Sequence, residues 1–186
     1  MVTIIVIAII VILVFVIIGI YNRLVHLRQD VNQSEADIDA QLRMRADLIP
    51  NLVETVKGYA AHEKSTLEAV IDARSKMVNA NGADAKLQAD NQLTGALRNL
   101  FALAEQYPDL KANTNFQELQ KQLTYTEEML AAARRSYNSQ VADYNSAIEA
   151  FPAVMFAGML GFSKRDFHRL STEEATRMVP PPSVKF

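Results

Sequence analysis

The chain has 186 residues and a formal net charge of -2 at pH 7, and 49% of its residues are hydrophobic. This near-neutral balance lacks the basic stripe that nucleic-acid-binding modules usually carry, so we expect no nucleic acid partner. The sequence has no cysteine, which excludes disulfides, thiol nucleophiles and cysteine metal sites. Every charged residue follows Asn22, so an apolar N-terminal segment precedes a part with the composition of a soluble domain.

The apolar segment, residues 2–20, consists of Ile, Val, Leu, Ala and Phe except for Thr3 and Gly19. As a helix it would span about 28 Å, close to the thickness of the hydrocarbon core of a bilayer. A cleaved signal peptide would instead have a basic start, a shorter apolar core and a small-residue cleavage site. We therefore predict a retained single-pass anchor in contact with membrane lipid, represented along its length by Val2, Ile10, Phe15, Ile20 and Tyr21.

The side of the membrane is indicated only by Arg23 and Arg28, because no basic residue precedes the anchor. The positive-inside rule places the end that carries these arginines in the cytoplasm. Asp30 follows at once, so the bias is small and a periplasmic or extracellular domain stays open.

Helical periodicity continues directly from the anchor, and no glycine or proline interrupts residues 21–44. We expect the anchor and the first soluble helix to form one rod. Pro50 is predicted to end it, with Asp47 as the N-cap of a second helix that reaches the loop at residues 79–82. The apolar face of that second helix is predicted to be Leu52, Val53, Val56, Tyr59, Leu67, Val70 and Met77.

Two further helices are predicted after Asp84 and from Phe116. The third ends at Tyr107-Pro108 and Lys111–Asn115. The fourth carries the longest apolar stripe in the chain, and it is predicted to comprise Phe116, Leu119, Leu123, Thr126, Leu130, Ala133, Tyr137, Val141, Tyr144, Ile148 and Phe151.

These elements predict an all-α fold, in which the N-terminal transmembrane helix continues into an antiparallel four-helix bundle. The predicted organisation is an anchor at 1–22, a long-helix bundle at 23–151 and a C-terminal part at 152–186. That last part holds an apolar segment at 153–162, a short charged helix at 166–178 and an extended tail at Pro180–Pro182. Residues 153–162 are too few to span a membrane, so they pack on the bundle, enter a subunit interface or dip into lipid.

No motif for catalysis is visible. His62-Glu63 begins like a zinc protease motif, but the second histidine one turn later is missing. His26 and His168 lie on other predicted elements, so a metal site would need convergence with carboxylates such as Asp37, Asp39 or Glu54. A nucleophile elbow and a phosphate loop are also absent. We expect no enzymatic activity, no catalytic residue, no cofactor and no metal.

Two segments are candidates for protein contacts. Arg43, Arg45 and Asp47 flank the predicted helix break, where capping and ion pairs at a turn are favoured over a recognition patch. The apolar candidates are Val154, Phe156, Met159, Leu160 and Phe162. Tyr-Asn pairs recur seven residues apart at 137–138 and 144–145, and an asparagine beside an apolar stripe needs a partner that can fix register.

Several blocks resemble the LemA family of bacterial membrane-anchored proteins across nearly the whole chain. The most specific are DLIPNLVETVKG at 47–58 and YPDLKAN at 107–113, supported by Tyr21–Val25, Ala133–Asn138 and Phe151–Phe162. The resemblance implies one N-terminal anchor, a four-helix bundle and no established enzymatic activity. It also implies a location in a bacterial cell membrane and association with membrane organisation or with membrane proteases.

The resulting hypothesis is a non-enzymatic helical scaffold that forms a homo-oligomer at the bacterial inner membrane. The alternative is a monomeric or small-oligomer adaptor that docks onto another membrane protein, such as a protease.

Overall fold

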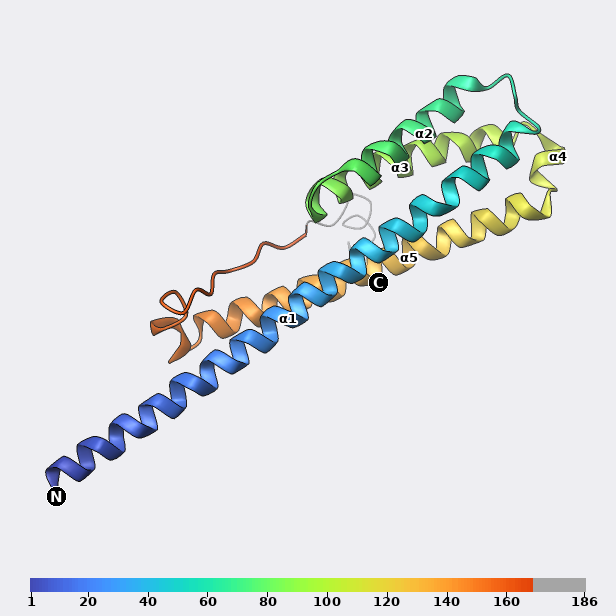
Figure 1. Cartoon of the computed structure of the whole chain (residues 1–186). Helices are drawn as coiled ribbons and strands as arrows, with labels where there is room; N and C mark the ends of the chain where they lie inside the picture. Colours follow the sequence, from blue (N-terminus) through green and yellow to red (C-terminus); the bar gives the residue numbers. More distant parts are fainter. Residues whose placement is uncertain (169–186) are drawn as a thin grey trace, which may run out of the picture. The chain divides into compact units, whose positions relative to one another are not determined.

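A computed structural model of the chain describes residues 1–168 (Figure 1). Its helices are α1 (Val2–Lys57), α2 (Lys64–Asn79), α3 (Ala83–Ala104), α4 (Pro108–Lys111) and α5 (Thr114–Glu149), followed by a 3₁₀ turn at Ala153–Met155. No strand occurs in this range, which confirms the all-helical class.

The described chain packs as two compact units. Unit 1 comprises Met1–Ala36 with Arg135–His168, and unit 2 comprises Asp37–Arg134. The long helices α1 and α5 contribute residues to both units.

Helix α1 contains the predicted anchor. Its most apolar stretch has a mean hydropathy of 3.6, and among residues 1–168 it is the one helix long and apolar enough to cross a membrane. The side chains of this stretch are exposed, with Phe15 at 69%. Because a helix satisfies its own backbone hydrogen bonds, such a segment can enter lipid without unpaired polar groups. The helix continues without interruption to Lys57, which confirms the predicted rod up to Met44.

The predicted helix break at Pro50 is wrong, because Pro50 lies inside α1. Proline has no N–H, so the carbonyl of Ala46 loses its usual helical donor. The structure supplies another donor: Nε of Arg74, on α2, donates to this carbonyl at 2.8 Å. Asp47 is therefore a residue of the helix interior and caps nothing, and α1 ends only before Gly58. The second helix begins at Lys64, well after its predicted start.

This replacement of a helical donor predicts an energetic coupling between Pro50 and Arg74. Arg74→Met should lower the free energy of unfolding by about 1–2 kcal/mol, since a partly buried carbonyl loses its donor. In a Pro50→Ala background the helix supplies its own N–H, so the same change should cost clearly less. Urea unfolding of the four proteins in detergent, followed by circular dichroism, measures the difference. Equal costs in both backgrounds would show that Arg74 does not replace the proline's missing donor.

Unit 2 has an apolar core made from the second half of α1, from α2, α3 and α4, and from the first half of α5. Helices α2 and α3 lie side by side in it (Figure 1). Its most buried side chains are Ile38, Ile49, Leu52, Val56, Val70, Met77, Leu93, Leu100, Leu110 and Leu130. The predicted apolar faces largely agree with this core, but Tyr59 is exposed because it follows the end of α1.

Unit 1 has a smaller core, to which α1 contributes Leu24 and Val31. Helix α5 and the segment after it contribute Tyr137, Val141, Tyr144, Ile148, Ala153, Ala157 and Phe162. Phe151 was predicted to close the apolar stripe of the fourth helix. It is instead 81% exposed, because α5 ends at Glu149 and the chain turns away.

Two asparagines of α5 fasten residues 165–168 to the helix. Asn145 exchanges two hydrogen bonds of 2.9 Å with the backbone of Arg165, and Asn138 does the same with His168. Seven helical residues rise about 10.5 Å, and three extended residues span about 10 Å, so the two spacings match. These asparagines were predicted to need a partner that fixes the register of the fourth helix, and the partner is the backbone of residues 165 and 168.

Residues 166–168, where the charged helix was predicted to begin, are not helical. The remainder of that predicted helix and the Pro180–Pro182 tail lie outside the described residues.

Candidate functional site

A buried network of charged side chains lies in unit 2. Asp90 of α3 accepts hydrogen bonds from Nη1 of Arg45 at 3.0 and 3.2 Å and from Nη2 of Arg134 at 3.3 Å. Nη2 of Arg45 also donates to Oγ1 of Thr94 at 3.0 Å. Asp90 and Arg45 are 1% and 2% exposed. The half-exposed carboxylate of Glu127 lies 3.8 Å from Nη2 of Arg45 and adds a second negative charge at the edge of the network.

Arg45, Asp90 and Arg134 are all buried, and they share a feature of the sequence that could have indicated it. Each is charged but lies on the apolar stripe of its helix, three or four residues from a buried leucine. The clearest case is Asp90, which stands in the series Leu87, Asp90, Leu93 and Leu97. Burying a charge is costly unless it is paired and hydrogen-bonded, and this network meets that condition for Asp90. The network thus joins α1, α3 and α5 within unit 2 through specific charged contacts.

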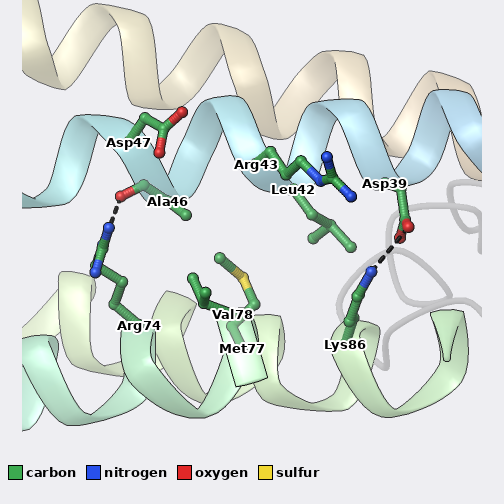
Figure 2. Close-up of a pocket in the computed structure, with 9 residues that line it drawn as sticks. All are labelled: Asp39, Leu42, Arg43, Ala46, Asp47, Arg74, Met77, Val78 and Lys86. Carbon is green, nitrogen blue, oxygen red and sulfur yellow. Dashed lines mark hydrogen bonds and ion pairs between the residues drawn. The ribbon is translucent and has the colours of Figure 1, made fainter. Parts of the chain in front are cut away.

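A hollow of about 350 Å³ lies between α1, α2 and the start of α3 (Figure 2). Its apolar lining comes from Leu42, Met77 and Val78. Two polar contacts bridge it: Lys86 pairs with Asp39 at 2.8 Å, and Arg74 donates to the Ala46 carbonyl. Of the three apolar side chains only Val78 is exposed, so the hollow presents a mixed surface that includes charged residues of both signs.

Arg43 and Asp47 are at the rim of this hollow, and both are exposed. Figure 2 shows them on the face of α1 that borders the hollow, without a bond to its other lining residues. Capping and ion pairs at a turn were the favoured reading for this segment, and that reading is wrong because α1 has no turn here. The structure thus separates the predicted trio. Arg45 is buried in the charged network, whereas Arg43 and Asp47 are exposed.

The apolar candidates after α5 also divide into two groups. Phe162 is buried in unit 1, together with Ala153 and Ala157, which were not among the candidates. Val154 and Met159 are exposed, and Phe156 and Leu160 are partly covered. The segment thus contributes to a core and also leaves large apolar side chains on the surface.

The His62-Glu63 pair lies in the connection between α1 and α2, not within a helix as predicted. The hydroxyl of Tyr107 donates to Oε1 of Glu63 at 3.3 Å. Loss of hydration, and then the negative charge and hydrogen bond of Glu63, raise the pKa of the Tyr107 phenol, which stays a neutral donor. Within residues 1–168, no three His, Asp or Glu side chains converge in a way that could hold a metal ion.

The comparisons with known proteins point to one family. The LemA family model matches residues 34–186. Magnetosome proteins MamQ 1 and MamQ 2 of Paramagnetospirillum magneticum are each 24% identical over 187 residues, covering 87% of this chain and 69% of the relative. Protein LemA of Metamycoplasma hominis is 29% identical over 142 residues, covering 74% of this chain and 63% of the relative.

Proposed function

Because the chain belongs to the LemA family, we propose that it is a non-enzymatic scaffold that self-assembles at the bacterial inner membrane through its helical part. The observation that carries the proposal is the continuity of α1. The apolar stretch at 2–20 and the soluble residues up to Lys57 are one helix, with no flexible linker between them. A helix without a break transmits the placement of its anchor to the residues that follow.

The proposed architecture is an antiparallel four-helix bundle built on the soluble part of α1 with α2, α3 and α5. The buried network of Arg45, Asp90 and Arg134 supports it, because it ties three of these helices together by specific charged contacts. We place this bundle on the cytoplasmic side, since Arg23 and Arg28 follow the anchor and no basic residue precedes it.

An adaptor is the second candidate function, and the hollow beside α1 favours it. Its apolar lining and exposed rim residues of opposite charge, Arg43 and Asp47, form a surface on which a segment of another membrane protein could dock. Such a rim supplies orientation, and the exposed side chain of Val78 is apolar surface that a partner can cover. In this reading the partner is another protein, for example a membrane protease, and the chain itself stays monomeric or forms small oligomers.

Self-assembly predicts that two differently tagged copies of the full chain, co-expressed and extracted in mild detergent, co-purify on either tag. Copies expressed separately and mixed after extraction are the matched control for association that forms only in detergent. We expect strong co-purification of the co-expressed pair and little of the mixed pair. Recovery of one tagged copy alone, together with a stoichiometric second protein, would contradict the scaffold and support the adaptor.

A further inference from the structure

The segment after α5 is held against the end of the anchor in unit 1. The ring of Phe162 meets the ring of Tyr21 edge-on, with 5.6 Å between centroids, and the guanidinium of Arg28 lies 5.0 Å from the Phe162 centroid. Ile17 and Ile20 are partly covered, unlike most of the apolar stretch that precedes them. Figure 1 shows this segment beside α1 within the unit. It therefore lies at the level where the anchor ends.

Residues 150–163, which we call the apolar loop, have fixed ends. The carboxylate of Glu149 pairs with Nζ of Lys164, which closes the base of the loop. Directly beyond, Asn145 binds the backbone of Arg165, whose side chain donates to Oδ1 of Asn32 at 3.0 Å. A polar base thus ties the apolar loop to both α1 and α5.

The outer surface of the apolar loop is strongly hydrophobic. Small alanines at 153 and 157 and the ring of Phe162 point inward, while the larger side chains of Phe151, Val154, Met155 and Met159 are exposed. Met159 is 87% exposed. No charged residue occurs between Glu149 and Lys164. Several large apolar side chains exposed within one short segment, with polar residues at its two ends, indicate an interaction site with a protein or a membrane.

We propose that the apolar loop is a second membrane contact, which inserts into the interfacial layer of the bilayer beside the end of the anchor. This inference rests on the proposed membrane anchoring of α1. The occupant is lipid and not a second copy or another protein, because the loop is continuous with the anchor through the Tyr21–Phe162 contact. A bilayer that surrounds residues 2–20 necessarily reaches the level of Tyr21. Aromatic and other apolar side chains with a polar border are typical of segments that lie in the interface.

Lipid contact at two places limits the freedom of the protein on the membrane. A single spanning helix can tilt and rotate about its axis, whereas a loop inserted beside it fixes one face toward the membrane. The loop therefore orients unit 1 with respect to the bilayer.

The chain contains no tryptophan, so single tryptophans report on individual positions. Full-length Met159→Trp is reconstituted into phosphatidylcholine vesicles with plain or brominated acyl chains, since bromine quenches tryptophan on contact. Phe15→Trp reports on the anchor. Tyr125→Trp, at an exposed position of unit 2, is the control for a residue in water. We expect loss of emission in brominated vesicles at residues 159 and 15, and none at residue 125.

The tryptophans at residues 159 and 15 distinguish a loop that does not contact lipid from an anchor that does not enter the bilayer. Quenching at residue 15 but not at residue 159 would overturn the lipid contact and leave the anchor in place. If the unquenched emission at residue 159 is also blue-shifted, protein and not lipid covers the loop, and in vesicles that contain only this protein the cover is a second copy. No quenching at either position would overturn both the anchor and the lipid contact. Met159→Trp replaces an exposed side chain, and circular dichroism checks that the helix content of the variant equals that of the unchanged protein.

Discussion

Asp90→Asn should lower the free energy of unfolding by about 3–5 kcal/mol, because it leaves two buried guanidinium groups facing a neutral amide. Asparagine has the shape of aspartate, so the change removes the charge and preserves the packing. The cost is large because Arg45 and Arg134 both direct their charge at this one carboxylate, within 3.3 Å. Chemical unfolding of the full-length protein in detergent, followed by circular dichroism, measures it.

Two control variants show whether the loss of stability comes from the buried charge of Asp90. Glu127→Gln removes a half-exposed carboxylate at the edge of the same network and should cost at most about 1 kcal/mol. The triple variant Arg45→Met, Asp90→Leu, Arg134→Met replaces the whole network with apolar side chains and should recover most of the stability lost in Asp90→Asn. A nearly neutral Asp90→Asn would show that the buried arginines do not depend on this carboxylate.

Leu123→Asp should unfold unit 2. Leu123 is buried on the apolar stripe of α5, and the substitution both removes its packing and buries a charge without a partner. Core leucine truncations alone cost about 2–5 kcal/mol, and an unpaired buried carboxylate adds to that. This sum approaches the total stability of an ordinary domain, about 5–15 kcal/mol. Loss of cooperative thermal unfolding is the expected readout, and Leu130→Asp, at another buried position of the stripe, should behave in the same way.

The matched control is Thr124→Asp, one position further along α5, where the side chain is exposed. The two variants place the same residue on the same helix and differ in the face on which it lies. Thr124→Asp should change the free energy of unfolding by no more than about 0.5 kcal/mol. Cooperative unfolding that survives in Leu123→Asp would contradict the register of α5 in the core.

Much of the fold could be predicted from the sequence because it depends on local periodicity. The apolar stretch before Arg23 requires a helix by its length, and the stripe from Phe116 to Ile148 recurs at helical spacing with few breaks. Both lie in helices of the structure. The asparagines at 138 and 145 were also identified, because an amide beside an apolar stripe needs a partner.

Features that depend on distant residues could not be predicted in the same way. Pro50 indicates a helix end when only its neighbours are considered, and the donor that compensates for it comes from Arg74 on another helix. The pairing of Arg45 with Asp90 joins residues 45 positions apart. Their stripe positions could have marked both as buried, but the choice of partner depends on how the helices pack. The exposure of Phe151 likewise follows from the turn after α5.

The most direct test of the proposed scaffold is the mass and shape of the full-length protein in mild detergent, measured by light scattering and electron microscopy. The scaffold predicts a regular particle of many copies, larger than one 20.7 kDa chain with its detergent. A strictly monomeric chain, with no self-contact after crosslinking in native membranes, would contradict self-assembly.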